Sequence, residues 1–408
     1  MVDEALQEFL NAVDCLPLQL EGVTALESLG RILGKDIVAD KYLPPTDRSV
    51  VDGYAVRCED VENASEQKPV ILEVVGESRI GETCRVVVKP KTAVWVATGS
   101  MIPRGADSVV MIERTRRISG DRVAVHAPTT PGENVVKKGE DVAPGLNVLK
   151  KGRRLRSADI GILTALGLTK VHVVRKPTVA LISTGNELVD TPKKRDLAKI
   201  VDTNRPMLSA MVRELGANPI DFGIVKDSEG EIKAVLRKAL RTCDAVMISA
   251  GSSVGMKDLV PRCIDDLGNP GMLVHGVAMR PALPTGLAVC GGKPVLSLPG
   301  FPVSAIIAFR VFGRPLIAKL SGSELAPEQV VRAVLKEKIS GPPGYRTFVR
   351  VRVRKTTEGF LAEPLKVQRS SVLMSIVAAN GIITIPEHTS SYEAGSMVDV
   401  TVVGQLAL

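Results

Sequence analysis

The chain has 408 residues, more than a single hydrophobic core usually organises, so about two to four domains are expected. Hydrophobic residues make up 45% and charged residues 24%, which is typical of a globular protein in water. No apolar run reaches the roughly 18 to 20 residues of a membrane helix. The N-terminus carries acids where a signal peptide carries basic residues, so we expect a cytoplasmic protein.

The net charge and the rare residue types narrow the range of ligands. A formal net charge of +8 suits anionic ligands. Aromatic residues make up only 3%, which disfavours nucleic acid because few side chains are available for stacking on bases. The six cysteines form no Cys-x-x-Cys pair and the four histidines have no paired spacing, so reduced thiols are expected and zinc is disfavoured. Any metal ion should be bound by oxygen atoms.

Residues 1–45 begin with two predicted helices, an amphipathic one followed by a second at 24–34. In the second helix, Thr24 is placed to act as the cap, with Glu27 three residues later. Residues 142–175 return to a helix and a strand. We expect them to rejoin residues 1–45 in one elongated domain, so that the segment between them is an insertion.

Two segments alternate short β-prone runs with Gly and Pro turns, which predicts two separate β-domains. In the inserted segment, 46–141, the predicted strands lie at 50–57, 69–78, 84–90, 92–99, 107–113 and 121–126. The C-terminal segment, 321–408, predicts a small barrel or sandwich with strands at 328–339, 345–355, 360–367, 380–386 and 396–403.

Between residues 176 and 320, predicted strands alternate with predicted helices, which indicates a parallel, doubly wound α/β sheet. The predicted strands lie at 178–183, 218–225, 244–250, 271–279 and 293–300. The predicted helices lie at 204–216, 227–240, 257–268 and 301–320.

Ligands of such a sheet bind beyond the carboxyl ends of the strands, where three loops of this domain are expected. The first loop, STGNELVD, combines the hydroxyls of Ser183 and Thr184 with Gly185, whose backbone can approach an anion. Glu187 would repel a phosphate unless Mg²⁺ lies between them, so one interpretation is a phosphate with a metal ion. The alternative is that Glu187 caps a short helix.

The second loop follows the strand AVMISA and is rich in small residues. These residues are Gly251, Ser252, Ser253 and Gly255. They can cradle a phosphate while Asp258 binds the metal ion, but an ordinary strand-to-helix turn with Asp258 near the cap is the alternative.

The third loop, SLPGFPVSA, places Ser304 in the first turn of a helix, where free N–H groups attract an oxyanion, although a plain helix start is the alternative. Nearby, Arg280 can bind an oxyanion through two donors. In the inserted β-domain, Asp52 precedes a glycine in a possible hairpin turn, and Asp141 lies at the domain junction. Taken singly, each of these two acids fits a structural role.

Several common enzyme classes are disfavoured. The chain has no G-x-x-x-x-G-K-[ST] motif of a P-loop NTPase and no G-x-G-x-x-G after a strand. So few histidines give no Ser-His-Asp set.

Taken together, these stretches resemble the molybdopterin molybdotransferase family, which includes bacterial MoeA and the E domain of gephyrin. The matching stretches are VVDGYAVR, ATGSMIPRGADSVVMIE, KKGEDVAPG, RKPTVALISTGNELVD, SAGSSVGMKDLV and LPGFPVSAIIAF. They occur in the family's order and at its spacing, so the resemblance covers nearly the whole chain.

The resemblance implies a multi-domain α/β plus β fold with four domains. These are an elongated helical and strand domain (1–45 and 142–175), an inserted β-domain (46–141), a doubly wound α/β molybdopterin-binding domain (176–320) and a C-terminal β-barrel (321–408). It also implies an elongated homodimer. The active site would lie in a cleft between the α/β domain of one subunit and the inserted β-domain of the other.

The family takes adenylylated molybdopterin from a partner adenylyltransferase, hydrolyses its AMP link with Mg²⁺ and inserts molybdate. The resemblance implies the same activity here, with molybdate or tungstate as the metal substrate. It assigns Glu187 and Asp258 to Mg²⁺ and the pyrophosphate link, Asp227 and Asp141 to further acids of the cleft, Asp52 and Thr98 to the contribution of the inserted β-domain, and Arg280 and Ser304 to the neighbourhood of molybdate.

The chain departs from the family pattern at three positions. Met256 stands where the family usually has an acid, Leu283 where it usually has a lysine, and Phe301 where it has asparagine or tyrosine. An acid and a cation are lost together, so the local charge stays balanced. The alternative function is a non-catalytic pterin-binding or scaffold paralogue. Retention of clustered acids, which repel one another and serve no purpose in a scaffold, favours the enzyme.

Overall fold

The computed structural model describes residues 1–13, 18–191, 198–250, 259–325 and 327–406. The chain divides into two compact units, and each is described by itself. Unit 1 comprises Met1–Glu21, Gly30–Ile32 and Val173–Leu408, and unit 2 comprises Gly22–Leu29 and Leu33–His172. Among the described residues, no helix has the length and apolar character needed to cross a membrane.

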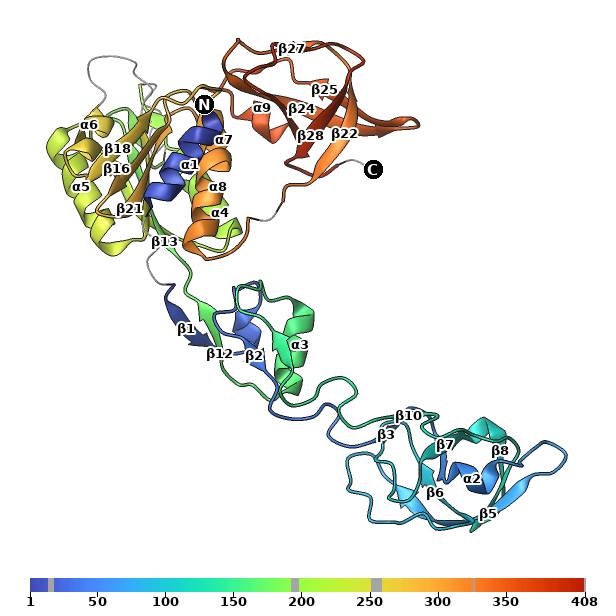
Figure 1. The fold of residues 1–408 in the computed structure, drawn as a ribbon. Coiled ribbons are helices and arrows are strands. Elements are labelled where there is room, and N and C mark those ends of the chain that lie inside the picture. Colours follow the sequence, from blue (N-terminus) through green and yellow to red (C-terminus); the bar gives the residue numbers. More distant parts are fainter. Residues whose placement is uncertain (14–17, 192–197, 251–258, 326, 407–408) are drawn as a thin grey trace. The chain divides into compact units, whose positions relative to one another are not determined.

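Unit 1 contains a six-stranded sheet that forms the centre of the α/β fold (Figure 1). In spatial order its strands are β16 (Asn218–Val225), β13 (Thr178–Thr184), β17 (Ala245–Ala250), β21 (Lys293–Pro299), β20 (Gly286–Cys290) and β18 (Pro270–His275). The first four strands are mutually parallel, whereas β20 runs antiparallel to both of its neighbours. The sheet is therefore mixed at one edge, and strand β20 was missing from the predicted elements.

Helices cover both faces of this sheet (Figure 1). One face packs against α5 (Glu229–Thr242) and α6 (Leu259–Asp265), and the other against α1 (Val2–Ala12), α4 (Asn204–Glu214), α7 (Pro302–Ala308) and α8 (Arg314–Leu320). The strands supply both cores by alternation: Val179 and Leu181 join the α1/α4/α7/α8 side, and Ala180 and Ile182 join the α5/α6 side. The doubly wound α/β arrangement expected from the sequence is confirmed.

The predicted helix over 301–320 is interrupted by a π-helical turn, η3 (Phe309–Gly313), between α7 and α8. Pro315 lies at the start of α8. It has no N–H to donate to the carbonyl group four residues earlier, and its ring would clash there, so the helix widens. Gly313 fits because a Cβ atom at this position would lie only 2.7 Å from the Phe309 ring.

The C-terminal part of unit 1 is a closed barrel of five strands. They are β24 (Arg346–Thr356), β25 (Gly359–Pro364), β22 (Val330–Leu335), β28 (Met397–Val402) and β26 (Gly381–Ile385), which pairs again with β24. A sixth strand, β19 (Met279–Arg280), leaves the α/β region and pairs in parallel with the beginning of β24. Shorter elements are the pair β23 (Ile339–Ser340) and β27 (Ser391–Tyr392), and the turn α9 (Met374–Val377). Of the two predicted possibilities, barrel and sandwich, the structure has the barrel.

Unit 2 contains the inserted β-domain, a six-stranded sheet. In spatial order its strands are β7 (Ser108–Met111), β4 (Gly53–Val56), β6 (Thr92–Val96), β5 (Val70–Ser78), β9 (Arg122–Val125) and β8 (Thr115–Ser119). Two short helical segments, α2 (Cys58–Val61) and η2 (Ile112–Arg114), accompany it. The strand predicted at 84–90 is wrong. Among the described residues, Val87 forms only an isolated bridge with Arg104, and Pro90 has no N–H with which to continue a ladder.

The remainder of unit 2 is built from small elements. They are η1 (Leu26–Ser28), α3 (Ser157–Ala165), the strand pair β2 (Ile37–Val38) with β11 (Asn147–Leu149), and the pair β3 (Arg48–Ser49) with β10 (Val135–Val136). Strands β1 (Leu20–Val23) and β12 (Val171–Val174) complete the set of elements in this part of the sequence.

The helix predicted at 24–34 is wrong in extent. Thr24 and Glu27 do form the reciprocal capping hydrogen bonds, at 3.0 Å and 3.3 Å. The helix nevertheless ends after one 3₁₀ turn, because Leu29 is extended and Gly30 takes a left-handed conformation with φ +73°. The four domain boundaries expected from the sequence stay a prediction.

Candidate functional site

The first predicted loop begins at the carboxyl end of β13. Ser183 and Thr184 are buried there, and the Ser183 hydroxyl lies 3.1 Å from the hydroxyl of Ser249 on the neighbouring strand β17. Gly185 follows and donates its N–H to the carbonyl oxygen of Val225 at 3.2 Å. Both side chains are therefore enclosed at the carboxyl end of the sheet, directly before the loop.

Glu187 folds back over Gly185. A Cβ atom at Gly185 would lie 2.8 Å and 2.9 Å from the two carboxylate oxygens of Glu187, and 2.9 Å from Cγ of Leu188. Gly185 also has φ +158°, a conformation that favours glycine. Among the described residues, the Glu187 carboxylate has neither a hydrogen bond nor an ion pair, so its oxygens are free to bind a cation.

Asp227 lies at the next strand, in the loop that follows β16. Its carboxylate accepts a hydrogen bond from the Asn186 N–H at 3.2 Å, and its own N–H donates to the side-chain oxygen of Asn186 at 3.3 Å. The neighbouring strands β13 and β16 thus bring two of the predicted acids, Glu187 and Asp227, to either side of Asn186. This part of the predicted site forms one loop cluster.

The second predicted loop lies outside the described residues. It contains Gly251, Ser252, Ser253, Gly255, Met256 and Asp258. The flanking elements follow the predicted order, because β17 ends at Ala250 and α6 begins at Leu259. The role expected for Asp258 stays a prediction.

The third predicted loop joins β21 to α7. Ser304 lies in the first turn of α7 and is 4% exposed. The loop is tied to the first turn of α4, because the side-chain N–H of Asn204 donates to the carbonyl oxygen of Gly300 at 2.8 Å. Phe301, at one of the three departures from the family pattern, is 46% exposed.

Arg280 is exposed and lies at the end of β19, beside the barrel. Its guanidinium group stacks over the ring of Tyr345, 5.2 Å from the ring centre. The adjacent Ala282 has φ +93°, a left-handed conformation, and the hydroxyl of Thr285 donates to its carbonyl oxygen at 2.7 Å. Leu283, the second departure in this region, is 39% exposed, so it does not fill the interior.

The residue that the sequence reasoning missed is Arg350. It lies on β24, is 0% exposed, and its Nε and one Nη atom have no hydrogen-bond partner among the described residues. It lines a cavity of about 450 Å³ together with Arg280, Pro281, Lys338, Ser340, Thr347, Gln368 and Ser370. Two further cations, Arg280 and Lys338, line the same cavity, so it is suited to an anion with several oxygen atoms.

A buried guanidinium group without an anion is costly, because its charge has been removed from water without compensation. Burial accordingly lowers the pKa of Arg350 from its ordinary value. Its backbone is satisfied: Gln368 accepts from its N–H at 3.1 Å and donates to its carbonyl oxygen at 2.8 Å. Only the side-chain donors remain, which is the arrangement expected of a binding group.

The alternation of β24 explains why Arg350 escaped notice. Val349, Val351 and Val353 are buried in the barrel core, so the intervening arginines face outward. Arg352 and Arg354 are indeed exposed. Arg350 differs only because residues from β19 and from the segment after β25 cover it, a tertiary contact that strand periodicity does not reveal.

In unit 2, the structure brings together two of the three predicted residues. The Asp52 carboxylate accepts hydrogen bonds from the N–H of Thr98 at 2.7 Å and from its hydroxyl at 2.9 Å. These bonds, the backbone one first, hold the pKa of Asp52 below its ordinary value. Glycine is needed at position 53 because a Cβ atom there would lie 2.0 Å from the carbonyl oxygen of Val110. The close approach of this neighbouring strand, and not a hairpin turn, therefore accounts for Gly53.

Asp141, the third predicted residue of unit 2, does not contact Asp52 or Thr98 among the described residues. Its N–H donates to the carbonyl oxygen of Leu43 at 3.1 Å, and its side chain is exposed.

The metal-binding capacity of the loop cluster rests on oxygen atoms. Within the described parts of the chain, no group of three or more His, Cys, Asp or Glu side chains is arranged around a common point. Glu187 has a free carboxylate, and oxygen ligands of this kind suit Mg²⁺, which keeps several of its waters and needs only one or two carboxylates. The residues present therefore fit Mg²⁺ better than a transition metal.

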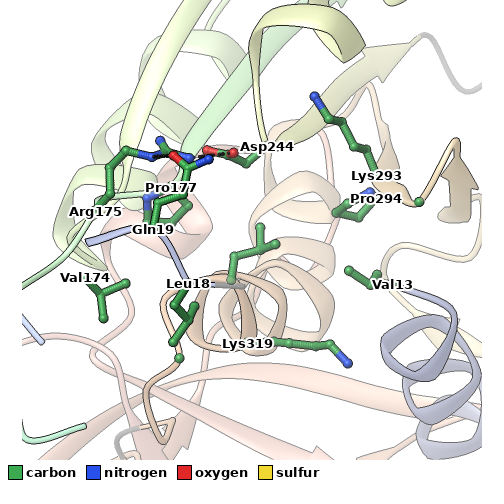
Figure 2. A pocket seen from close by; sticks show the side chains of 13 residues that line it. Val13, Leu18, Gln19, Val174, Arg175, Pro177, Asp244, Lys293, Pro294 and Lys319 are labelled. Atoms are coloured by element: carbon green, nitrogen blue, oxygen red, sulfur yellow. Dashed lines mark hydrogen bonds and ion pairs between the residues drawn. The ribbon is translucent and has the colours of Figure 1, made fainter. Parts of the chain in front are cut away.

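A further cavity, of about 270 Å³, lies at the amino ends of β13, β17 and β21 (Figure 2). Three cations line it, but their donors are used. Arg175 pairs with Asp244 at 2.8 Å, Lys293 donates to the carbonyl oxygens of Leu240 and Cys243, and Lys319 donates to the carbonyl oxygen of Leu10. The two lysines bind carbonyl oxygens near the C-terminal ends of helices, and Arg175 is held by Asp244. Each of these cations therefore has a structural role.

Three family models match successive parts of the chain. They are described as the MoeA N-terminal region (domain I and II) over residues 1–167, "Probable molybdopterin binding domain" over residues 180–319, and the MoeA C-terminal region (domain IV) over residues 332–403. Together they cover both units and all of the loops described above.

Curated relatives match over nearly the full length. The molybdopterin molybdenumtransferase of Staphylococcus epidermidis is 33% identical over 374 residues, which are 92% of this chain and 89% of that protein. That of Bacillus subtilis is 34% identical over 388 residues, with 94% and 90% covered. The crystal structure of the molybdopterin biosynthesis moeA protein from Pyrococcus horikoshii OT3 is 35% identical, covers 98% of this chain and 99% of that one, and has a TM-score of 0.83. The chain therefore belongs to the MoeA family of molybdopterin molybdenumtransferases.

Proposed function

We propose that this protein is a molybdopterin molybdotransferase, which hydrolyses the AMP link of adenylylated molybdopterin and inserts molybdate, or tungstate, into the pterin. Membership of the family supports the reaction class. The observation that carries the proposal is Arg350, a buried arginine that lines a cavity of about 450 Å³ with Arg280 and Lys338, and whose Nε and one Nη atom have no hydrogen-bond partner among the described residues. A tetrahedral oxyanion with several acceptor oxygens matches those donors.

We propose that the loop cluster of the α/β domain handles the phosphoanhydride. Glu187, with Asp258 from the neighbouring loop, would hold Mg²⁺, which when bound supplies positive charge beside the phosphates. Ser183, Thr184, Gly185, Gly251, Ser252, Ser253 and Gly255 would bind the substrate through hydroxyl and backbone N–H groups. Asp227 is held by Asn186 next to Glu187, which supports its assignment to the same cluster.

We propose that Asp52 and Thr98 contribute from the inserted β-domain, and that Asp141 completes the cleft. Two hydrogen bonds from Thr98 orient the Asp52 carboxylate and lower its pKa, which favours its charged form. Arg280 and Ser304 are proposed to bind the oxyanion, with Arg350 added to this group. The homodimer, the site shared between subunits and the adenylyltransferase partner stay predictions that the resemblance supports. A cytoplasmic location stays a prediction from the acidic N-terminus.

The shared site has a direct test. Subunits carrying Asp258→Ala and subunits carrying Asp52→Ala would be mixed, and AMP release would be measured in purified heterodimers. Recovery of activity is expected, since one of the two clefts would then be whole. Verified heterodimers without activity would place both residues on the same side of the interface.

The reaction itself is tested by AMP release from adenylylated molybdopterin after addition of molybdate and Mg²⁺. Glu187→Gln is expected to reduce the rate by about two orders of magnitude, whereas Glu231→Gln, an exposed carboxylate on α5, serves as the matched control and should leave it unchanged. A wild-type protein that binds the pterin but releases no AMP would instead identify a non-catalytic, pterin-binding or scaffold protein.

A further inference from the structure

The first turn of α4 buries two polar side chains that the proposed chemistry does not use. Asn204 is 5% exposed and Arg205 is 8% exposed, although both lie at the beginning of a helix, where polar residues usually face water. Asp202 caps this helix, because its Oδ1 accepts the N–H groups of Asn204 at 3.1 Å and Arg205 at 3.2 Å. The cap is therefore complete without the side chains of Asn204 and Arg205.

Asn204 connects the helix to the third loop. Its side-chain N–H donates to the carbonyl oxygen of Gly300 at 2.8 Å, and Gly300 leads directly into the turn that carries Ser304. Its side-chain oxygen is buried and has no hydrogen-bond partner among the described residues. A residue selected only for stability would not leave a buried acceptor unpaired, which costs free energy.

Arg205 connects the same turn to the first loop. Its guanidinium group contacts three carboxylates: Asp202 at 3.3 Å, Asp221 at 3.0 Å, and Asp190 through a short hydrogen bond. Asp190 ends the loop that carries Glu187, directly after β14 (Leu188–Val189). Strand β14 pairs with β15 (Ile200–Val201), and the N–H of Asp202 donates to the carbonyl oxygen of Val189 at 2.9 Å.

The two loops do not touch through the sheet itself. The first loop follows β13 and the third follows β21, and β17 lies between these strands in the sheet. Contacts outside the sheet can therefore help to fix the spacing of the two loops. Asn204 and Arg205 are adjacent residues on one helical turn, and each makes a direct bond to one of the two loops.

We propose that Asn204 and Arg205 are positioning residues that hold the loop of Glu187 and the loop of Ser304 at a fixed separation. The inference rests on the proposed function, since these loops carry the groups assigned to the phosphoanhydride and to the oxyanion. Small displacements of reacting groups slow a reaction strongly. A fixed separation of the two loops therefore lowers the activation barrier more than it tightens substrate binding. The effect should therefore fall on kcat, with KM for the pterin nearly unchanged.

A matched pair of variants tests this at the surface. Asp190→Asn and Asp221→Asn each remove one carboxylate from Arg205, with the same change of charge, and the two side chains are equally exposed at 68%. Only Asp190 belongs to the Glu187 loop. We expect Asp190→Asn to lower kcat by about threefold, because it weakens the connection to the Glu187 loop. Asp221→Asn should lower kcat by less than about 1.5-fold, because it leaves that connection intact. Both effects are small because exposed ion pairs are weak. Equal effects of the two variants would overturn the proposal.

Asn204→Ala tests the other connection. It should lower kcat by about tenfold, the equivalent of one well-formed hydrogen bond. Lys233→Met, which removes a cation bound to Glu229 and Asp266 on the opposite face of the sheet, should leave kcat unchanged. A purely structural role for Asn204 would lower the melting temperature without lowering kcat well below that temperature, and this result would also overturn the proposal.

Hydrogen exchange separates this proposal from the proposed function. Asn204→Ala should accelerate exchange of two N–H groups of the first loop, although of the two loops Asn204 bonds to the third. These are the N–H of Gly185, which donates to the carbonyl oxygen of Val225, and the N–H of Leu188, which donates to that of Gly185. Unchanged exchange in an active enzyme would refute the coupling. If the wild type releases no AMP while Asn204→Ala still accelerates exchange in both loops, the proposed reaction fails and the mechanical link stands.

Discussion

The first turn of α4 and the outer face of the barrel each bury an arginine, but their surroundings are opposite. Arg205 is 8% exposed and contacts three carboxylates, whereas Arg350 is 0% exposed and contacts none among the residues that the structure describes. Within the described parts of the chain, carboxylates surround the first arginine and none pairs with the second. A buried arginine that is paired with carboxylates stabilises the fold, and one without a counter-charge indicates where an external anion can bind.

Arg205→Met should produce the largest effect of this comparison. Removing the cation leaves the buried Asp202, 6% exposed as a residue, beside two other carboxylates without compensation. We expect the free energy of unfolding to fall by about 3 kcal/mol. Urea unfolding followed by circular dichroism measures this, and a loss below about 1 kcal/mol would mean that Arg205 is not the centre of the network.

Arg350→Met should act in the opposite direction in the absence of an oxyanion. It removes a buried charge whose pKa is already lowered by burial, so the free energy of unfolding should rise by about 1 to 2 kcal/mol. Added molybdate should then raise the melting temperature of the wild type but not of the variant. A destabilised Arg350→Met protein would show that the chain itself compensates the charge.

Gly185→Ala separates the loop cluster from the cavity. The added Cβ would displace the Glu187 carboxylate and Leu188, both of which lie within 2.9 Å of its position. AMP release should fall by about tenfold, while the affinity for molybdate stays unchanged. Gly230→Ala is the control, because a Cβ atom at Gly230 meets nothing within 4 Å. Equal loss of molybdate affinity in Gly185→Ala would merge the two regions into one site.

The smallest effect concerns a third arginine, Arg346. It has two carboxylate partners, fewer than Arg205 and more than Arg350. It forms two hydrogen bonds with Asp3, at 2.8 Å and 2.7 Å, and one with Glu387 at 3.1 Å. The bonds from Arg346 lower the pKa of Asp3. Burial raises the pKa of Glu387, but hydrogen bonds from its own backbone and from Arg346 outweigh that and lower it.

A lowered carboxyl pKa stabilises the folded state above the unfolded-state value, and this stability is lost as the pH falls through the folded-state value. Starting from unfolded values of 4.5 for Glu387 and 3.8 for Asp3, stability should therefore decline below pH 4.5. In urea unfolding at a series of pH values, Asp3→Asn should decline less steeply, by under about 1 kcal/mol because Asp3 is mostly exposed. Arg350→Met should show the same decline as the wild type, since no carboxylate is paired with Arg350 in the described parts of the chain.

The sequence predicted most of the fold because hydrophobic periodicity and the Gly and Pro residues that end helices and strands are local signals. The strand–helix alternation of residues 176–320 and the barrel strands were found, and Pro315 could have revealed the π turn. Strand β20 was missed, although its residues, Gly286–Cys290, are all buried, since a short apolar run shows no alternation. The predicted length of the helix at 24–34 was wrong because the cap at Thr24 indicates only where the helix begins. Gly30 ends it after one turn.

The sequence predicted the site less completely. The resemblance assigned Glu187 and Asp227 to one cleft and Asp52 and Thr98 to the inserted β-domain, and these roles stay predictions. The structure shows the loops of Glu187 and Asp227 in contact through Asn186, and Asp52 in contact with Thr98. Arg350 could not be found, because its alternation with Arg352 and Arg354 predicts an exposed side chain. Burial of that one arginine is decided by residues 70 positions away at Arg280, a contact that no local pattern encodes.

The measurement that tests the account most directly is a calorimetric titration of molybdate into the wild type, Arg350→Met and Arg352→Met. The two variants remove the same group from the same face of β24, but only Arg350 is buried. Charge-assisted hydrogen bonds to an oxyanion predict a Kd at least about 30-fold weaker for Arg350→Met, and a change within about threefold for Arg352→Met. Wild-type affinity in Arg350→Met, or equal loss in both variants, would contradict the assignment of the cavity to the oxyanion.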